Sequence, residues 1–323
     1  TDSGNKRAQI WDVATGKEVL SLAGHDESVG SVSFSASGAE LATGSLDGTV
    51  RIWRVVDALP RDVLRDENKS ELLASSLDGT VLATVSTTYP AKPVIHIWDA
   101  ASGAELRSFV SEDESIGSIA VSPDGRVLAT GDYDDDEEQN DVRLWDVATG
   151  KQMFVLQGHR DRIHSIAYSQ DGLRLATASE NESVNIWDTK TGTQISSIDR
   201  SDQHLTNMAF SGDGRLVVTG VYNGHVSILD SATGKELHDL SLPNRLESVA
   251  ISHHPRIVAA AGEGIVQLWD AATGAELVAL RGHDGDIGQT VFALDQTRIL
   301  TGSDDGTVRA WDLPSGVALM HIS

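Results

Sequence analysis

The feature of this sequence that most constrains its fold is the spacing of its tryptophans. An apolar residue followed by Trp and, in most cases, Asp recurs along the whole chain. The central position of this motif falls at Trp11, Trp53, Trp98, Trp145, Trp187, Leu229, Trp269 and Trp311. The steps between these positions are 40 to 47 residues long, and all seven tryptophans of the chain occupy this one position. A period of this length indicates an array of similar supersecondary units that bury their apolar faces on one another.

Each repeat has the pattern of four short β-strands. In the repeat that ends at Trp53, residues 29–34 and 41–45 alternate in polarity, with one irregular position in the first run. Residues 46–48 form a turn, and residues 49–53 form a third strand. A Thr-Gly or Ser-Gly turn and a fourth apolar strand follow in most repeats, where the Gly supplies the positive φ that the hairpin needs. Sheets of this kind cover one another when they are stacked radially around an axis, so the pattern predicts an all-β fold of the β-propeller type.

The sequence resembles the WD40-repeat proteins over its whole length. The resemblance rests on the Trp-Asp ends, on a Gly-His pair that opens several repeats and on an Asp-Gly turn before the third strand. The Gly-His pairs are Gly24-His25, Gly158-His159 and Gly282-His283, and the Asp-Gly turns are Asp47-Gly48 and Asp305-Gly306. This resemblance implies a WD40 β-propeller with seven four-stranded blades, with eight blades or part of a tandem propeller as the alternatives.

The resemblance also implies a buried network in which the His, a Ser or Thr of the second strand, the turn Asp and the Trp are hydrogen-bonded within one blade. Two repeats have every member, namely His25, Asp47 and Trp53 with Thr43 or Ser45, and His283, Asp305 and Trp311 with Thr301 or Ser303. The repeat that ends at Trp187 has His159 but Asn181 in place of the Asp, so we expect an altered network there. The remaining repeats lack Gly-His, and we expect their blades to depend on packing alone.

These His, Asp and Ser residues also match the residue types of a hydrolase triad. A triad occurs once in an enzyme, whereas this set repeats along the chain and is expected to lie beneath neighbouring blades. We therefore predict that it satisfies buried polar groups. The sequence predicts no catalytic residue, no metal site and no cofactor.

Residues 1–22 read as the third and fourth strands of a repeat whose first half is missing, and residues 23–323 read as seven repeats that form one propeller. Three explanations remain open. The N-terminal strands close a seven-bladed ring by pairing into the last blade, which is the usual closure in this family. Alternatively, they belong to an eighth blade with two strands beyond Ser323, or they end a blade of a preceding propeller. Since the chain starts with Thr1, we expect it to be a piece of a longer protein.

The composition narrows the classes of partner. The net charge is −23, and such a surface repels a phosphate backbone, so we expect no nucleic-acid partner. A soluble acidic surface is the favoured interpretation, and attraction of a basic partner is the alternative. The chain has no cysteine, no apolar run of transmembrane length and no signal-peptide pattern, so we expect a cytoplasmic protein and no membrane contact.

Two turns before the third strand are longer than the others. One is acidic, over residues 132–141, and it carries alternating Asp residues but no Gly and no suitably spaced Glu of a calcium loop. We expect a solvated, mobile loop, and the sequence leaves open whether it binds a cation. The other, residues 86–93, is stiffened by two prolines and has Tyr89 near its tip. Because loops on a rigid scaffold often carry binding sites, both are candidate contact segments, with drift of surface loops as an equal alternative.

In WD40 proteins, partners often contact the surface made by the turn before the third strand and by the start of the first strand. Carried over by position, this implies a set of candidate partner-binding residues. The set is Leu46, Tyr89, Arg162, Glu180, His204, Tyr222 and Asp304. Leu46 and Tyr222 are the first choices, because an apolar or aromatic side chain in such an exposed position suggests a contact.

The sequence therefore predicts a non-enzymatic scaffold that binds a protein or peptide. The near-identical turns, such as VATGK at 13–17 and 147–151, resemble those of bacterial WD40 arrays, which implies the sensing or binding module of a larger signalling protein. The alternative is a hydrolase or ligand-binding propeller with a site at the central mouth. The expected innermost strands, such as GSIAVS at 117–122, offer little chemistry for that alternative.

Overall fold

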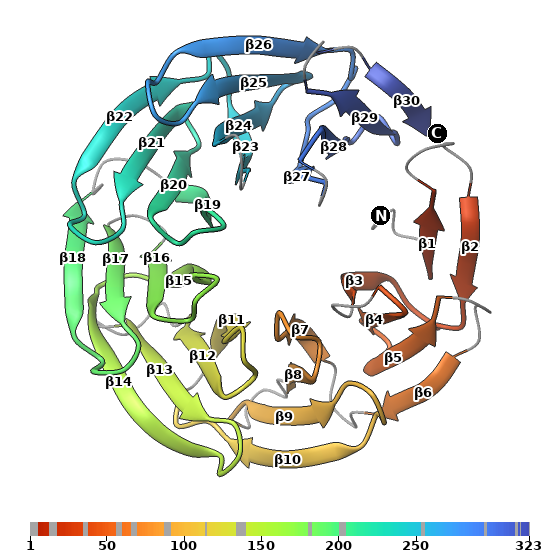
Figure 1. Cartoon of the computed structure of the whole chain (residues 1–323). Coiled ribbons are helices and arrows are strands. Elements are labelled where there is room, and N and C mark those ends of the chain that lie inside the picture. The colour runs from red at the N-terminus through yellow and green to blue at the C-terminus, as the bar shows by residue number, and fades with distance from the viewer. Residues whose placement is uncertain are drawn as a thin grey trace. The chain divides into compact units, whose positions relative to one another are not determined.

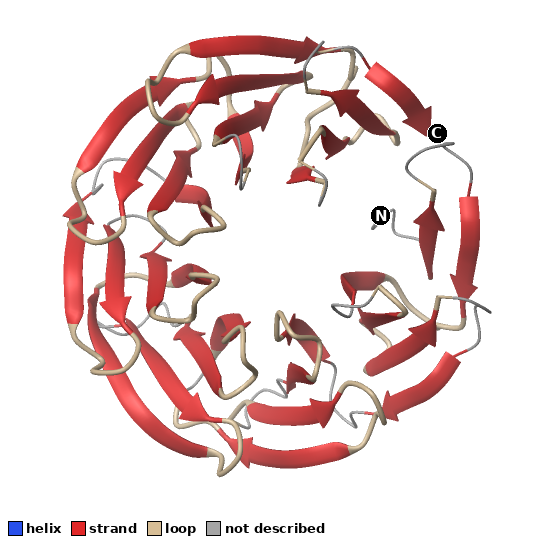
Figure 2. Cartoon of the chain, in the orientation of Figure 1, coloured by secondary structure: helices blue, strands red, loops and turns tan. Residues whose placement is uncertain are grey.

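The structure is a computed structural model that describes residues 6–12, 18–34, 38–55, 60–65, 70–86, 92–113, 115–133, 140–179, 183–199, 205–252, 256–293, 296–313, 316 and 318–322. Every regular element in these residues is a β-strand (Figure 2). Within the same ranges, no helix has the length and apolar character that crossing a membrane requires. The strands divide between two compact units.

The first unit consists of residues 1–11 and 18–168 and contains β1 to β15 (Figure 1). Its two-stranded sheet pairs β1 (Arg7–Trp11) with β2 (Glu18–Ala23). The first four-stranded sheet is β3 (Val29–Phe34), β4 (Glu40–Ser45), β5 (Thr49–Arg54) and β6 (Pro60–Arg65). The second is β7 (Ser70–Ser75), β8 (Val81–Ser86), β9 (Val94–Asp99) and β10 (Glu105–Val110). The third is β11 (Ile116–Val121), β12 (Val127–Asp132), β13 (Asn140–Asp146) and β14 (Lys151–His159), and β15 (Ile163–Tyr168) lies beside β11.

The second unit consists of residues 12–17 and 169–323 and contains β16 to β30. It begins with β16 (Arg174–Ser179), β17 (Ser183–Asp188) and β18 (Gln194–Asp199). Its next sheet is β19 (Leu205–Phe210), β20 (Leu216–Val221), β21 (His225–Asp230) and β22 (Glu236–Ser241). It is followed by β23 (Leu246–Ile251), β24 (Ile257–Gly262), β25 (Ile265–Asp270) and β26 (Glu276–Arg281). The last sheet is β27 (Gln289–Phe292), β28 (Arg298–Gly302), β29 (Val308–Asp312) and β30 (Ala318–Ile322).

The four-strand pattern occurs seven times along the chain, and the fourth occurrence runs from β15 to β18. The prediction of an all-β propeller fold with seven four-stranded blades is therefore confirmed. The blade that ends the chain takes its fourth strand from β30, and β1 and β2 form a sheet of two strands. How residues 1–22 relate to a complete blade stays a prediction.

The irregular position in the first strands is a β-bulge. In β3 the pairing with β4 shifts between Val29 and Ser31, and the same shift recurs in β7, β11, β19 and β23. A second recurrent shift lies just before the Trp position, as between Ile52 and Trp53 in β5. A bulge redirects the side chains that follow it, so this shift changes the direction of the indole relative to the regular alternation of the strand.

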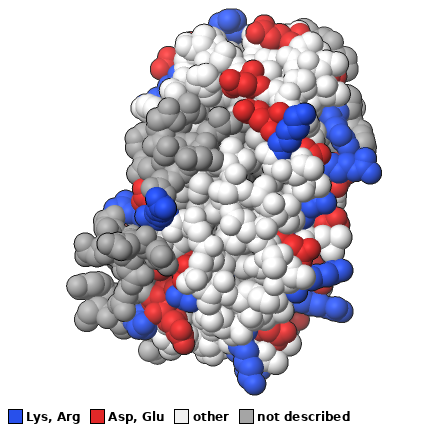
Figure 3. Space-filling model, turned by 90° about the vertical axis from the view of Figure 1, so that its left-hand side faces the viewer, with Lys and Arg blue, Asp and Glu red and all other residues white. Residues whose placement is uncertain are grey.

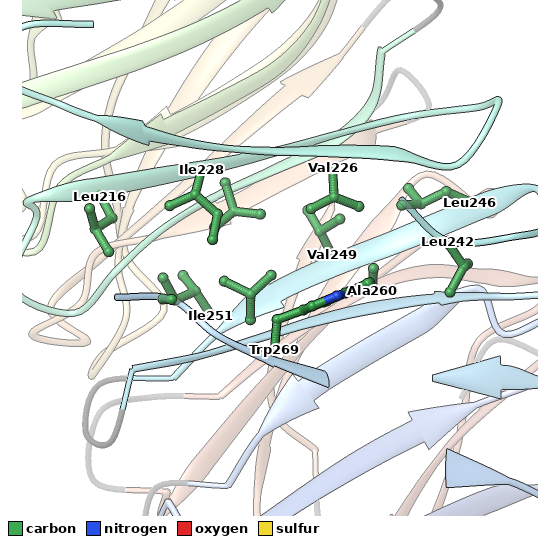
Figure 4. Close-up of a cluster of buried hydrophobic side chains, with 12 residues drawn as sticks. Leu216, Val226, Ile228, Leu242, Leu246, Val249, Ile251, Ala260 and Trp269 are labelled. Carbon is green, nitrogen blue, oxygen red and sulfur yellow. The ribbon is translucent and has the colours of Figure 1, made fainter. Parts of the chain in front are cut away.

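Several buried indoles pack on the sheet that precedes their own. Trp269 of β25 lies in a cluster with Val226 and Ile228 of β21, and Leu242 and Leu246 close the same cluster (Figure 4). Trp98 packs in the same way on the sheet of β3 to β6, Trp145 on that of β7 to β10, and Trp311 on that of β23 to β26. Because an indole buries a large apolar area, these contacts hold neighbouring blades together.

Candidate functional site

The polar residues of the first four-stranded blade meet at one buried point. His25 lies just before β3, Thr43 lies on β4, and Asp47 lies in the turn between β4 and β5. The imidazole Nδ1 of His25 is 2.9 Å from Asp47 Oδ2, and Nε2 is 2.7 Å from Thr43 Oγ1. Trp53 donates its indole N–H to the same Thr43 oxygen at 2.8 Å. The second-strand member is therefore Thr43, while Ser45 donates to the backbone carbonyl of Glu27.

The protonation states in this network follow from the donors. Burial lowers the pKa of His25 more than its Asp47 partner raises it, which favours a neutral ring. Asp47 only accepts, so Nδ1 carries the proton and Nε2 accepts from the Thr43 hydroxyl. Burial opposes ionisation of Asp47, but donors from Thr49, the Asp26 backbone and His25 together lower its pKa to about 2. The network is thus a chain of directed hydrogen bonds that ends on a carboxylate.

The last blade repeats this geometry. His283 lies 2.9 Å from Asp305 Oδ2 and 2.7 Å from Thr301 Oγ1, and Trp311 donates to Thr301 at 2.9 Å. The second-strand member here is Thr301 rather than Ser303. His159 is buried and burial lowers its pKa to about 4, while Asn181 lies outside the described residues.

The expectation that the other blades depend on packing alone is wrong for two of them. Trp98 donates to Thr84 Oγ1 at 3.1 Å, and Trp145 donates to Thr130 Oγ1 at 2.9 Å. Trp187 donates to Thr177 at 2.8 Å. The signal was present in the sequence, because Leu-Ala-Thr occurs in the second strand of all three blades and of the first blade. The blade of Leu229 keeps the threonine, since Thr219 lies opposite Ser227, but the Trp position there holds a fully buried Leu. The blade of Trp269 has Ala260 at the threonine position, opposite Gln267.

Burial decides what this network does chemically. Thr43 has no exposed surface, His25 is 5% exposed and Trp53 is 1% exposed. A nucleophile must reach its substrate, so a buried hydroxyl between an imidazole and an indole cannot serve as one. Asp47 also accepts from the Asp26 backbone N–H at 2.8 Å and from Thr49 Oγ1 at 2.6 Å. The network therefore fixes the turn before the third strand against the start of the first strand.

The turns that this arrangement positions carry exposed side chains. Leu46 is 46% exposed, and its N–H donates to the Ser28 carbonyl at 3.0 Å at the start of β3. Asp304, which is also exposed, makes the same bond to the Asp286 carbonyl at 2.9 Å. Tyr222 is 47% exposed and follows β20 directly. We call the surface formed in each unit by these turns and by the starts of the first strands the turn face.

Two tyrosine–arginine pairs lie on the turn faces, one in each unit. In the first unit, the Arg162 guanidinium lies 4.8 Å from the ring centroid of Tyr133, and in the second unit Arg245 lies 5.0 Å from that of Tyr222. Arg245 also donates to Tyr222 Oη at 2.9 Å and to Asp286 at 3.1 Å. Both tyrosines directly follow a second strand. Sequence reasoning identified Arg162 and Tyr222 but missed Tyr133 and Arg245, because each partner lies 23 to 29 residues away.

Several candidate residues cannot be placed. Tyr89, Glu180 and His204 lie outside the described residues, as do residues 134–139 of the acidic turn. At the ends of that turn, Asp132 is buried and burial raises the pKa of Asp141. Arg143 forms an ion pair with the Asp113 carboxylate. The charge of Arg143 also interacts with Asp132 and Asp141. In the described part of the chain, no group of three or more His, Asp or Glu side chains is arranged for a metal ion.

Comparison with known proteins gives matches across the chain. The family model "WD domain, G-beta repeat" matches residues 16–54, 103–146, 150–188 and 274–312, and the model "Anaphase-promoting complex subunit 4 WD40 domain" matches residues 197–254. Target of rapamycin complex subunit wat1 of Schizosaccharomyces pombe is 28% identical over 142 residues, which is 40% of this chain and 41% of that protein. A guanine nucleotide-binding protein subunit beta of Arabidopsis thaliana is 27% identical over 142 residues, which is 41% of this chain and 37% of that protein.

The chain thus spans less than half the length of these two relatives. A solved structure, that of the computationally designed Ika8 protein, superposes with a TM-score of 0.82 and 23% identity, and the match covers 96% of this chain and 92% of that one. At this identity the likeness concerns the fold alone.

Proposed function

Because the chain belongs to the WD40-repeat family of β-propeller proteins, we propose that it is a non-enzymatic module that binds a protein partner through its turn faces. The observation that carries the proposal is a division between buried and exposed residues. The His–Thr–Asp–Trp sets that recur are buried and structural, whereas Leu46, Tyr133 and Tyr222 are each more than 40% exposed on the turn faces.

The Tyr–Arg pairs support this choice of surface. Tyrosine and arginine are enriched at the centres of protein interfaces, because both combine a large contact area with directional donors. Arg245 is held by Tyr222, Glu247 and Asp286, so its side chain loses little freedom when a partner binds. The two relatives described above are named as subunits of larger assemblies, which agrees with a role in protein binding.

The module's wider setting is a further part of the proposal. We place it in the cytoplasm as the sensing or binding part of a larger bacterial signalling protein, on the strength of its repeated VATGK-type turns and its lack of cysteine. On the side of the molecule shown in Figure 3, Lys and Arg side chains are intermixed with Asp and Glu side chains. Because Leu46, Tyr133 and Tyr222 are exposed on the turn faces, we favour a partner that is bound by apolar and aromatic contacts over one that is bound by charge alone. A nucleic acid is disfavoured by the net charge of −23.

The test is a quantitative pull-down from lysate of the source organism with Leu46→Arg and Tyr222→Arg. The chain offers matched controls, since Leu77 is 56% exposed and Leu173 is 43% exposed in turns between first and second strands, at the other end of their blades. Leu77→Arg is the control for the first unit, and Leu173→Arg is the control for the second.

We expect at least one protein to be depleted tenfold or more by a turn-face variant and to be retained by both controls, as loss of an interface hot spot predicts. Equal retention by all four variants would show that the turn faces are the wrong surface. Equal loss in the control variants would mean that the effect is not specific to these faces.

A further inference from the structure

The third strand of every complete blade carries a polar residue two positions before the Trp position. The seven residues are Arg51, His96, Arg143, Asn185, Ser227, Gln267 and Arg309. His96 pairs with Glu105 at 2.9 Å, and Arg143 pairs with Asp113. The Asn185 side chain accepts a hydrogen bond from another side chain, and Gln267 donates to backbone carbonyls. A side chain at this position therefore usually has a partner close by.

Arg51 and Arg309 are the exceptions at this position. Among the described residues, neither guanidinium has a hydrogen-bond acceptor or an ion-pair partner, and the Nε atom of each is buried. Both arginines lie in the blades that carry the complete His–Thr–Asp–Trp set. The chain has 48 acidic residues against 25 Lys and Arg, so a shortage of carboxylates does not explain why these two cations are unpaired.

Packing on the Gly of a Gly-His pair holds each of these guanidinium groups in place. A Cβ atom added to Gly24 would lie 2.8 Å from Arg51 Nη1 and 3.2 Å from the Cη2 atom of Trp53. A Cβ atom added to Gly282 would lie 2.5 Å from Arg309 Nη1. Each glycine therefore leaves the space that a guanidinium occupies beside the indole, and the same arrangement occurs once in each unit.

A guanidinium that is fixed by packing suits the binding of a carboxylate. Its nitrogens form a rigid planar fork that matches the two carboxylate oxygens, and a fixed side chain loses little freedom on binding. Because the Nε atoms are buried, the Nη nitrogens are the ones that an incoming group can reach. A single positive charge in a chain of net charge −23 favours a monoanion over a phosphate dianion.

We propose that Arg51 and Arg309 are two equivalent binding sites for a carboxylate group, which the Nη nitrogens of each guanidinium hold. The inference goes beyond the proposed function, because it specifies a charge that the apolar and aromatic side chains of the turn faces do not. The first site lies close to a turn face, since Thr49, two residues before Arg51, donates to Asp47 of the turn at 2.6 Å. An acidic side chain of a protein and a small free carboxylic acid share this chemistry, and the experiment separates them.

The test uses the whole chain with ¹⁵N-labelled arginine, and Arg51→Lys and Arg309→Lys assign the two Nε signals. The probes, at constant ionic strength, are acetate and a capped Ala-Glu-Ala peptide, and capped Ala-Gln-Ala is the control. We expect acetate and the Glu peptide to shift both signals saturably and the Gln peptide to bind at least tenfold more weakly, because it lacks the charged fork. Tighter binding of the Glu peptide assigns the carboxylate to a protein, and tighter binding of acetate assigns it to a small acid.

A second variant removes the packing and keeps the charge. Gly24→Ala places a Cβ atom where the Arg51 guanidinium lies and should weaken binding at Arg51 several-fold, with the Arg309 signal as the reference in the same sample. Gly30→Ala is the matched control, because a Cβ atom added there meets no atom within 4 Å.

Three results would overturn the proposal. They are no shift of either signal with acetate or the Glu peptide, equal binding of the Glu and Gln peptides, and tighter binding of inorganic phosphate than of acetate. Unchanged binding at Arg51 in Gly24→Ala would contradict the role given to packing. These titrations use no protein partner, so their failure is distinguishable from a failure of the pull-down.

Discussion

Two neighbouring sheets of the first unit share a sequence pattern and differ in one partner. The blade of β3 to β6 and the sheet of β1 and β2 each have an Ile-Trp pair at or near the end of a strand. Trp53 is 1% exposed and bonded to Thr43, whereas Trp11 is half-buried and its N–H has no acceptor among the described residues. The third and fourth strands alone thus provide part of the packing of an indole, and in the complete blade the second strand adds the hydrogen-bond acceptor.

This difference assigns separate roles to packing and to hydrogen bonding. Ala8 and Leu22 are as buried in the small sheet as Ile52 and Val50 are in the complete blade, so apolar burial does not require the network. What the network adds is the link from Trp53 through Thr43 and His25 to Asp47, which holds the turn that exposes Leu46. The polar residues therefore position a turn face, while the indoles hold the sheets together.

The largest predicted effect is the difference in stability lost when the Trp53 ring and the Trp11 ring are removed. Trp53→Ala removes a fully buried ring and should lower the free energy of unfolding by about 3–5 kcal/mol. Trp11→Ala removes a half-buried ring and should cost about 1–2 kcal/mol. Urea unfolding followed by far-UV circular dichroism measures both. Equal losses would mean that the two sheets contribute alike.

The next effect isolates the shared acceptor. Thr43→Val keeps the shape of the side chain but leaves the Trp53 N–H and the His25 Nε2 without a partner, at a cost of about 1–3 kcal/mol. Thr80→Val is the control, because the Thr80 hydroxyl is exposed and donates to Asp78. The same unfolding assay applies, and a Thr43→Val protein as stable as the control would contradict the assigned network.

Acid should weaken the complete blade in two windows. The folded pKa of His25 lies below its ordinary value of 6.5, so protons bind the unfolded chain first and stability falls as the pH drops below 6.5. The folded pKa of Asp47, about 2, lies below 3.8, so its contribution is fully present above pH 3.8 and is lost as the pH falls toward 2.

We expect the loss in the second window to be on the order of 1–2 kcal/mol and to disappear in Asp47→Asn. Glu18→Gln, at an exposed carboxylate of β2, is the matched control and should leave the pH profile of the wild type unchanged. The measurement is the urea midpoint of the three proteins at intervals from pH 5 to pH 2.5. If the wild type, Asp47→Asn and Glu18→Gln proteins had the same pH profile, Asp47 would not be the cause of the acid-dependent loss of stability.

The smallest predicted effect is the loss of stability when Trp53 or Trp11 is replaced by phenylalanine. Trp53→Phe loses a satisfied hydrogen bond and should cost about 1–2 kcal/mol more than Trp11→Phe, which removes a donor that has no acceptor in the described structure. Thermal unfolding of both variants measures the difference. A larger loss for Trp11→Phe would show that the Trp11 N–H is bonded in the folded protein.

Much of this fold was accessible from the sequence, because the Trp period and the alternation of residues such as those in 29–34 reflect burial directly. The sequence could not decide whether Thr43 or Ser45 is the second-strand member of the network, because residues two positions apart on a strand lie on the same face of the sheet. The register, which sets Leu41 opposite Trp53, decides it.

The exposed pairs were harder to foresee. Tyr133 with Arg162 and Tyr222 with Arg245 join a second strand of one blade to the first strand of the next, so their contact depends on how blades pack. The orphan N–H of Trp11 was likewise hidden, because Trp11 has the same local sequence pattern as the other tryptophans. What distinguishes it is that β1 pairs with β2 alone among the described strands.

Hydrogen exchange at the indole N–H groups tests the central claim most directly, because one ¹⁵N spectrum reads every tryptophan. If second-strand threonines complete the blades, the Nε1 protons of Trp53, Trp98, Trp145, Trp187 and Trp311 exchange slowly and that of Trp11 exchanges faster than all five. A Trp11 proton as protected as the others, or five exposed protons in the complete blades, would contradict the account.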